Sequence, residues 1–509
     1  MTTFAEAARK ESAWKLTENG QPALNTTFNA CLDLFATIGG MRTRTAPEIC
    51  AKFAEAYKEY PLLATKIVFY ARDIRGVGLG ERRTPRILFE YMAKYHPEAL
   101  RPNIWLIPEY GRWDDVYALV GTPLESQMWA EMATQYRQDL KAMEKGEPVS
   151  LLAKWIYTPA RRNKEKAEIG KICCKEWDIS ETELNQNISK LRSYLKIVEK
   201  QMSRNEWGEI DYSAVPSRAS MIYRNAFVRH DKDRYEDYID RAVNGEAKIN
   251  SSALFPYDIV EKVWKNGSYW LGKRKFFEDK TLEAQWRQLP NYVEPGTNAM
   301  VVADTSGSMD GRPMYSALGL AIYFAERNTG AFHNLWMSFS NSSNIHELKG
   351  ETLAQKLSSI DMNDWSGSTN CEAAFDKILQ IGIRNHVAPE DMPKSIIIIS
   401  DMEFDSCNCD NSTKSDLYYF YGGNSRWTFY DEMKRKYAAA GYEICNIVFW
   451  NVNARHDTFH TDAEHEGVQL VSGQSTATFK NLVGSIGKTP VELMLDVINS
   501  ERYAPIKIG

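Results

Sequence analysis

The stretch VVADTSGSMDGRPM, residues 301–314, places a carboxylate and two hydroxyls at alternating positions directly after an apolar run. The carboxylate is Asp304, and the hydroxyls belong to Ser306 and Ser308. Such side chains can supply a nucleophile, surround a phosphate group or hold a metal ion. A turn that leaves a strand can point alternate positions the same way, so all three groups could reach one ligand.

Two further polar clusters stand beside predicted strands and helices. The segment DWSGSTN places Thr369 at the start of a predicted helix, and Asp401 directly follows the apolar run SIIII. Carboxylates and hydroxyls without thiolate or imidazole form a hard ligand set, which suits Mg²⁺ best and also Mn²⁺ or Ca²⁺. We therefore predict a divalent cation site formed by Asp304, Ser306, Ser308, Thr369 and Asp401.

Other chemistries fit these residues less well. A nucleophilic serine is expected in a Gly-x-Ser-x-Gly turn, and the stretch DTSGSM lacks the flanking glycines. No Gly-x-x-x-x-Gly-Lys-[Ser/Thr] run precedes the helices, which disfavours a phosphate-binding loop. Phosphotransfer of the haloacid-dehalogenase type needs a second aspartate where this chain has Ser306. A plain Ser/Asp turn that caps a helix stays open as the structural alternative for any single cluster.

The elements around these clusters predict a doubly wound α/β domain over residues 296–509. Strand-like runs such as AMVVAD, NLWMSFS and EICNIVFW alternate with helical runs such as MYSALGLAIYFAERN. Four isoleucines in a row, residues 396–399, indicate a strand that is buried on both faces, as in parallel sheets flanked by helices. The carboxyl ends of such strands lie at one edge, where ligands collect.

The first 290 residues predict a helical domain instead. Apolar positions recur at steps of three and four residues in segments such as APEICAKFAEAYKEY and ESQMWAEMATQYRQDLKAME. A long series of helix pairs favours an α-solenoid, although no fixed repeat motif is present, and an irregular helical domain stays open as the alternative. The segment RQLPNYVEPGTN, residues 287–298, marks the boundary between the two domains.

Composition limits the class of protein. The chain has 509 residues, of which 43% are hydrophobic, and no apolar run approaches the roughly 20 residues needed to cross a bilayer. Its eight cysteines are too few for a disulfide scaffold. We therefore expect a soluble, cytoplasmic protein. Residues 1–300 contain 45 Lys+Arg and 41 Asp+Glu, whereas residues 301–509 contain 17 Lys+Arg and 26 Asp+Glu. The first part is therefore the better candidate for binding a polyanion, and the second part for binding a cation.

Basic clusters in the helical part could meet phosphate groups. The segment RDIRGVGLGERRTPR gathers arginines around glycines, and KWIYTPARRNKEK sets cations beside Trp155 and Tyr157, the mixture that single-stranded nucleic acid favours. Nearby acids such as Asp114 and Asp115 could instead pair with these arginines. The candidate RNA-binding residues are Arg72, Arg75, Arg82, Arg83, Arg86, Lys154, Arg161, Arg162, Lys164, Arg218, Arg224, Arg229 and His230.

The pattern Asp304-x-Ser306-x-Ser308, Thr369 and Asp401 resembles the metal-ion-dependent adhesion site of von Willebrand factor A domains. The resemblance implies that the serines bind the metal directly, the threonine directly or through water, and the aspartates largely through water. It also implies that a sixth position is left for an acidic group from a partner.

A long helical region followed by such a domain resembles the TROVE-module proteins of the Ro autoantigen family, and more closely a related family of plants, bacteria and large viruses. The segments FYARDIRGVGLGERR, IPEYGRWDDVYALVG and GEAKINSSALFPYDIV carry the closer resemblance. The resemblance implies that the helices form a HEAT-repeat-like ring closed by the adhesion-site domain. It also implies a monomeric, non-catalytic protein that binds small structured or single-stranded RNA on this ring. The alternative is a metal-dependent protein-interaction or assembly module without an RNA role.

Overall fold

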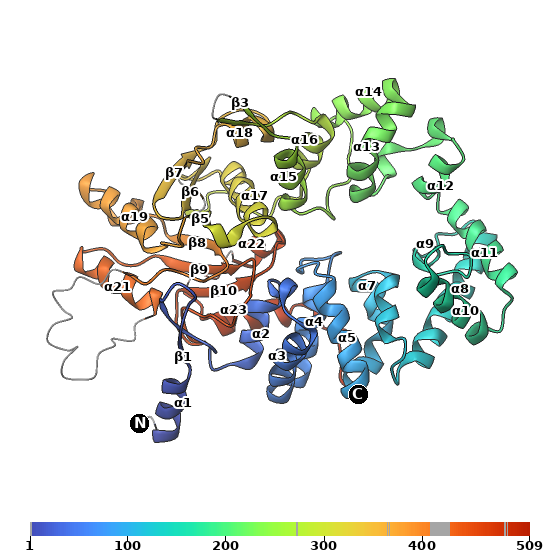
Figure 1. Cartoon of the computed structure of the whole chain (residues 1–509), viewed down its shortest axis with the longest axis horizontal. Coiled ribbons are helices and arrows are strands. Elements are labelled where there is room, and N and C mark those ends of the chain that lie inside the picture. The colour runs from blue at the N-terminus through green and yellow to red at the C-terminus, as the bar shows by residue number, and fades with distance from the viewer. Residues whose placement is uncertain are drawn as a thin grey trace. The chain divides into compact units, whose positions relative to one another are not determined.

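The computed structural model describes residues 3–270, 273–363, 365, 367–407, 428–482, 485 and 487–509 (Figure 1). The chain forms two compact units. Unit 1 comprises Met1–Tyr60, Phe255–Asp279 and Pro290–Ser500, and unit 2 comprises Pro61–Leu254, Lys280–Leu289 and Glu501–Gly509. Both units are therefore assembled from segments far apart in the sequence, whereas the sequence analysis divided the chain once, between residues 290 and 296.

Unit 1 contains a six-stranded sheet in the order β10-β9-β8-β5-β6-β7. Neighbouring strands are parallel except β7, which is antiparallel to β6. When the strands are numbered along the chain from β5 and the sheet is read from β7 to β10, this order is 3-2-1-4-5-6, that of a doubly wound sheet. The predicted fold class is confirmed. The strands are β5 (Ala299–Asp304), β6 (Leu335–Phe339), β7 (Ser343–Glu347), β8 (Ser395–Ser400), β9 (Asn446–Asn451) and β10 (Val468–Ser472).

Helices pack on this sheet because its central strands, β5 and β8, are apolar on both faces. Ile396–Ile399 of β8 are all buried, as predicted. Helix α17 packs on β5, α19 packs on β6 and β7, and α2 and α23 pack on β10. The helices of unit 1 are α1 (Phe4–Ser12), α2 (Ala30–Ile38), α3 (Ala46–Glu59), α15 (Pro256–Lys265), α17 (Arg312–Arg327), α18 (Leu353–Ser358), α19 (Glu372–Arg384), α21 (Phe429–Ala439), α22 (Ala477–Leu482) and α23 (Pro490–Ile498).

A hairpin near the N-terminus belongs to unit 1 and was not predicted. Strands β1 (Trp14–Leu16) and β2 (Pro22–Leu24) pair with each other. Isolated bridges join Gly20 to Asp405 and Leu24 to Phe459. Because Asp405 follows β8 and Phe459 follows β9, the hairpin lies at the carboxyl ends of these strands. A second short hairpin of unit 1 consists of β3 (Ser268–Trp270) and β4 (Lys273–Lys275).

Unit 2 is helical, as the sequence predicts. Its helices pack in pairs, for example α8 with α10 and α13 with α14. They are α4 (Pro61–Arg72), α5 (Arg83–Tyr95), α6 (Pro97–Leu100), α7 (Ile107–Tyr110), α8 (Glu125–Glu144), α9 (Leu152–Trp155), α10 (Lys164–Trp177), α11 (Glu181–Tyr194), α12 (Val198–Ser203), α13 (Ser217–His230), α14 (Lys232–Val243) and α16 (Lys280–Arg287).

Short 3₁₀ helices connect several of these elements. One of them is η3 (Trp113–Leu119), which lies in the segment GRWDDVYALVG. The others are η1 (Met41–Thr43), η2 (Arg101–Leu106), η4 (Trp207–Glu209), η5 (Tyr212–Ala214), η6 (Gly307–Met309), η7 (Pro389–Asp391) and η8 (Glu501–Tyr503). None of the helices in the described ranges combines the length and apolarity that crossing a bilayer requires.

Candidate functional site

The first predicted cluster lies in the loop that follows β5. Asp304 is the last residue of that strand and is 0% exposed. Its carboxylate accepts hydrogen bonds from the Ser306 amide, at 2.9 Å, and from the Ser400 hydroxyl, at 2.5 Å. The hydroxyl oxygens of Ser306 and Ser308 are 3.2 Å apart. The loop thus gathers the three predicted oxygen-bearing side chains.

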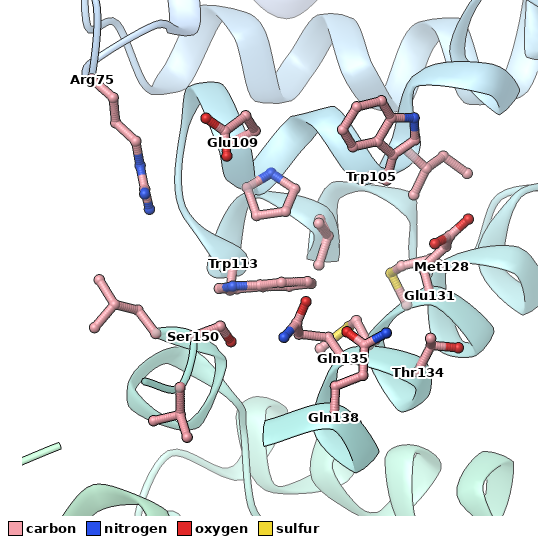
Figure 2. A pocket seen from close by; sticks show the side chains of 16 residues that line it. Arg75, Trp105, Glu109, Trp113, Met128, Glu131, Thr134, Gln135, Gln138 and Ser150 are labelled. Carbon is pink, nitrogen blue, oxygen red and sulfur yellow. The ribbon is translucent and has the colours of Figure 1, made fainter. Parts of the chain in front are cut away.

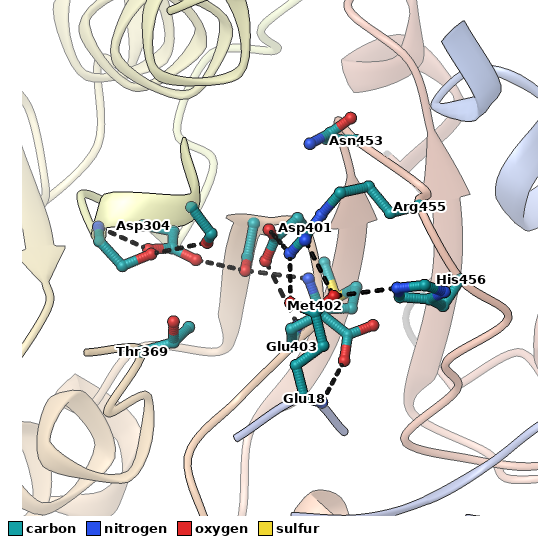
Figure 3. Close-up of polar contacts among 12 residues, drawn as sticks. Glu18, Asp304, Thr369, Asp401, Met402, Glu403, Asn453, Arg455 and His456 are labelled. Atoms are coloured by element: carbon teal, nitrogen blue, oxygen red, sulfur yellow. Dashed lines mark hydrogen bonds and ion pairs between the residues drawn. The ribbon is translucent and has the colours of Figure 1, made fainter. Parts of the chain in front are cut away.

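Thr369 and Asp401 lie at the same edge of the sheet. Asp401 directly follows β8, the neighbour of β5, and is buried. The Gly307 amide donates to the Gly367 carbonyl at 3.1 Å, which ties the first loop to the segment that carries Thr369. Figure 3 shows the side chains of Asp304, Thr369 and Asp401 near one another. In a sheet of this order, β5 and β8 flank the switch point where ligands bind.

The electrostatics of this edge favour a cation. Burial, and then the charge of Asp401, raise the pKa of Asp304 to about 7. Two adjacent buried carboxylates are costly unless positive charge compensates them. The remaining oxygens are hydroxyls, and within the described ranges three or more histidine, cysteine, aspartate or glutamate side chains are nowhere arranged so that they alone could hold a metal ion. This donor set is hard and suits Mg²⁺ rather than Zn²⁺.

Three residues that the sequence analysis did not predict complete the site. Arg455 forms an ion pair with Asp401 at 2.9 Å and with Glu18 at 2.8 Å (Figure 3). The Asn19 amide donates to the Glu403 carbonyl at 2.6 Å and to the Thr369 hydroxyl at 3.3 Å. Glu18 and Asn19 lie in the turn of the N-terminal hairpin. Local sequence patterns do not reveal such contacts, because the partners are 54 residues apart for Arg455 and Asp401 and more than 300 residues apart for the others.

In unit 2, a buried pair of aspartates organises several predicted arginines. Asp115 accepts from Arg72 at 2.6 Å and from Arg86 at 2.5 Å, and Asp114 pairs with Arg82 at 2.6 Å. Burial acts to raise the pKa of Asp115, but Arg72 and Arg86 hold it below its ordinary value.

Arg72 is 2% exposed and bound to this buried carboxylate, so it leaves the set of residues proposed to contact RNA. The pairing with nearby acids that the sequence left open applies to Arg82 and Arg86 as well. Arg82 nevertheless keeps half of its side chain exposed. Arg75 is exposed, and its guanidinium donates to the Gly111 carbonyl at 3.2 Å.

Cations lie over aromatic rings in the neighbouring segment. We call Tyr117, Trp155 and Tyr157 the aromatic platform. The rings of Tyr117 and Tyr157 stack with centroids 4.2 Å apart and planes 9° apart. Cations stand over two of these rings: Arg112, 4.2 Å, and Lys154, 5.8 Å, from the Trp155 centroid, and Arg161, 5.7 Å, and Lys166, 5.2 Å, from the Tyr157 centroid. The predicted mixture of basic and aromatic residues is therefore present.

The remaining candidates lie elsewhere in unit 2. Arg83, Arg162 and Lys164 are exposed. A separate group lies on α13, where His230 stacks on Trp207 with centroids 4.2 Å apart. Arg224 donates to the Met221 carbonyl at 2.6 Å, while Arg218 and Arg229 are exposed. In Figure 1, α11 and α12 come between α9 and α13. The structure therefore divides the candidates between two groups.

A cavity of about 500 Å³ opens in unit 2 between α8 and residues 104–116 (Figure 2). Trp105 and Trp113 line it together with the carboxylates of Glu109 and Glu131 and the guanidinium of Arg75. Its charge is mixed, and it lacks the oxygen cluster of the sheet edge. We assign it no role in metal binding.

Comparisons with known proteins match both parts of the chain. Residues 298–497 match a family model described as a domain of unknown function, DUF7788, and residues 17–147 and 176–295 match another, DUF2828. "Uncharacterized protein L728" of Acanthamoeba polyphaga mimivirus is 27% identical over 539 residues, covering 97% of this chain and 88% of the viral protein. The crystal structure of the Deinococcus radiodurans RO (RSR) protein matches with a TM-score of 0.44 and 14% identity, covering 94% of this chain and 100% of that one. The chain is thus similar over nearly its whole length to a viral protein, and its two family matches adjoin between residues 295 and 298.

Proposed function

We propose that the protein is a non-catalytic RNA-binding protein whose helical unit binds single-stranded RNA or small structured RNA. The observation that carries the proposal is the aromatic platform with cations over its rings. Bases stack on aromatic faces whatever their sequence, and Lys and Arg beside them bind the phosphates. Besides the cations over the rings, the exposed candidates Arg75, Arg82, Arg83, Arg162 and Lys164 would extend the contact.

A matched pair of tryptophan variants tests the platform. Labelled single-stranded RNA is titrated with the full chain, and binding is followed by fluorescence anisotropy at several salt concentrations. We expect Trp155→Ala to weaken binding about tenfold, since stacking contributes roughly 1–3 kcal/mol per base. Trp105→Ala is the control, because Trp105 is 54% exposed and is not part of the platform. Equal affinity of the Trp155→Ala variant and the wild type would contradict the proposal.

The purified protein offers an independent test. We expect it to carry nuclease-sensitive material that high salt releases, because phosphate contacts weaken steeply with ionic strength. The ratio of absorbance at 260 and 280 nm before and after a salt wash measures this material. Turnover of nucleotides or phosphate esters by the purified chain would contradict the non-catalytic part of the proposal.

We further propose that unit 1 holds a divalent cation, Mg²⁺ foremost, at Asp304, Ser306, Ser308, Thr369 and Asp401. When bound, the cation supplies positive charge between two buried carboxylates. Thermal unfolding with Mg²⁺ and with a chelator tests this site, because a ligand of the folded state raises the unfolding temperature. No difference between the two conditions at millimolar Mg²⁺ would count against it.

The second candidate function is a metal-dependent protein-interaction module. One observation favours it: the guanidinium of Arg455 lies beside Asp401, so the cation and Arg455 would both attract a carboxylate from a partner. Such binding should be lost with chelator and in Asp304→Ala, and it should not change in Trp155→Ala. RNA binding predicts the opposite pattern.

A further inference from the structure

Two arginines of unit 2 converge on a single carbonyl oxygen. Arg192 belongs to α11, and Arg161 lies in the loop after α9. Both donate to the Ile156 carbonyl, Arg161 at 3.3 Å and Arg192 at 3.2 Å. Two guanidinium groups that share one acceptor are close neighbours of like charge. Their repulsion must be offset by an anion or by solvent.

No carboxylate within the described ranges compensates these two arginines at ion-pair distance, which is 4.0 Å or less. In the same unit, by contrast, Arg72 and Arg86 bind the carboxylate of Asp115 at 2.6 and 2.5 Å. Burial, and then the charge of Arg161, lower the pKa of Arg192 to about 10. Arg192 therefore stays charged at neutral pH while its charge is only partly solvated.

A pocket of about 310 Å³ lies beside Arg192. Lys196, Lys200 and Arg204 line it with Arg192, and the Lys200 ammonium is held by the Ser189 hydroxyl at 2.7 Å. Burial, and then Arg204 and Arg192, lower the pKa of Lys200. Two carboxylates also line the pocket: Glu206 pairs loosely with Arg204 at 3.9 Å, and Glu209 is exposed. The cations still exceed the carboxylates.

Helix capping accounts for only part of this arrangement. Arg192 donates to the carbonyls of Ala153 and Ile156 at the end of α9, a common role for a cation. These bonds use two of the five N–H groups of its guanidinium. A cap needs a single cation, so it explains neither Arg161 on the same carbonyl nor Lys200 and Arg204 around the adjoining pocket.

We infer that the cations lining this pocket form an anion site, the basic pocket, that takes a phosphate group, with Arg161 beside it on the carbonyl that it shares with Arg192. The lining cations are Arg192, Lys196, Lys200 and Arg204. Guanidinium groups bind phosphate oxygens through paired N–H groups, and ammonium groups add charge. The phosphate belongs to the backbone of a bound RNA strand, and in that respect the inference rests on the proposed function. The same chemistry would also accept free phosphate, which the experiment distinguishes.

The experiment uses the full chain and variants that spare the arginines bonded to backbone carbonyls. Lys200→Gln and Arg204→Gln each remove one cation of the basic pocket, and Lys141→Gln removes an exposed cation of α8 as the control. Labelled single-stranded RNA is titrated at several salt concentrations, and inorganic phosphate is titrated separately by thermal unfolding. Circular dichroism checks that each variant is folded.

We expect each pocket variant to weaken RNA binding about three- to tenfold and to reduce the log–log salt slope by about one unit, with no change for Lys141→Gln. A thermal shift with inorganic phosphate that Lys200→Gln removes would identify a free phosphate ligand and would also support the anion site. Wild-type behaviour of both pocket variants toward both probes would overturn the inference.

The failures of the two proposals are distinguishable. If Trp155→Ala weakens RNA binding while Lys200→Gln and Arg204→Gln change neither probe, the basic pocket is wrong and the proposed function stands. If RNA does not bind but Lys200→Gln removes a shift with inorganic phosphate, the proposed function is wrong and the anion site stands.

Discussion

Each unit contains a pair of buried aspartates, and the two pairs are compensated differently. In unit 2, Asp114 and Asp115 are surrounded by arginines, and the pKa of Asp115 is held below its ordinary value. In unit 1, Asp401 has one arginine, Arg455, and the pKa of Asp304 is raised to about 7. The first pair has its charge neutralised within the protein, whereas the second leaves negative charge that a cation from solution can neutralise.

This difference gives the buried carboxylates of the two units different expected roles. A buried carboxylate whose hydrogen bonds come from arginines stabilises the fold, and its removal leaves unpaired cations behind. Asp304, whose partners are an amide and a hydroxyl, would keep capacity for the proposed cation. Removing the carboxylate should therefore have opposite effects on stability in the two units.

The largest effect is expected for Asp115→Asn. Asp115 binds Arg72 and Arg86 and accepts from the Arg112 amide, so its loss leaves the buried Arg72 guanidinium without its partner. We expect a loss of about 3–5 kcal/mol in the free energy of unfolding. Denaturant unfolding measures it, with the exposed Glu165→Gln as control. A change of less than about 0.5 kcal/mol, the usual range for surface substitutions, would contradict the structural role of Asp115.

Asp304→Asn should act in the opposite direction when no divalent cation is present. The folded-state pKa of about 7 exceeds the ordinary 3.8, so stability contributed by this group is present at low pH and is lost as pH rises toward 7. At pH 8 with chelator, the neutral amide should therefore stabilise the protein by up to about 4 kcal/mol, since the pKa rises from 3.8 to about 7 and each pKa unit corresponds to about 1.4 kcal/mol.

The same variant should lose any stabilisation by Mg²⁺. Thermal unfolding with chelator and with Mg²⁺ measures both effects, and Asp310→Asn, an exposed change in the same loop, is the matched control. If Asp304→Asn destabilises the chelated protein, the charge of Asp304 is already compensated within the protein, and the proposed difference between the two units is wrong.

Arg455→Met tests the one ion pair that compensates Asp401 in unit 1. Arg455 competes with a cation for Asp401, so its removal should raise the affinity for Mg²⁺ about tenfold, or about 1.4 kcal/mol. Isothermal titration calorimetry measures this change. The control is Arg384→Met, an exposed change at the end of α19. Weaker Mg²⁺ binding would mean that Arg455 positions Asp401 rather than competing for it.

The smallest effect is expected for Asn19→Ala. Asn19 attaches the hairpin turn to the Glu403 carbonyl and to Thr369, and loss of these hydrogen bonds should cost about 1 kcal/mol. Thermal unfolding of the full chain measures it. If Mg²⁺ affinity also falls, Asn19 helps to orient Thr369. Unchanged affinity would limit its role to stability.

The elements with strong local patterns could be predicted from the sequence. The run of isoleucines identified β8, and the apolar stretch before Asp304 identified β5, because buried strands are continuous in hydrophobicity. Strand β7, with the sequence SNIHE, was missed because an edge strand alternates polar and apolar residues over a short length. Arg455, Glu18 and Asn19 were missed because long-range contacts leave no local periodicity.

The sequence also could not distinguish buried from available arginines. Arg72 and Arg75 are three residues apart in one basic segment, yet Arg72 lies in the core and Arg75 is exposed. The difference depends on Asp115, which η3 brings to Arg72 from elsewhere in the chain. The position of an arginine along a helix does not reveal whether a carboxylate from another segment pairs with it.

The discontinuous units have a consequence for synthesis on the ribosome. Chains emerge N-terminus first, so the hairpin at Glu18 and Asn19 is made long before β8 and β9, against which it pairs. Unit 2 also depends on a late segment, because the buried Asp73 receives Arg502 and Tyr503 from residues 501–509. Each unit can therefore be completed only after most residues of the other have been made. The nascent protein must keep a large, partly folded surface from aggregating until these late segments have emerged.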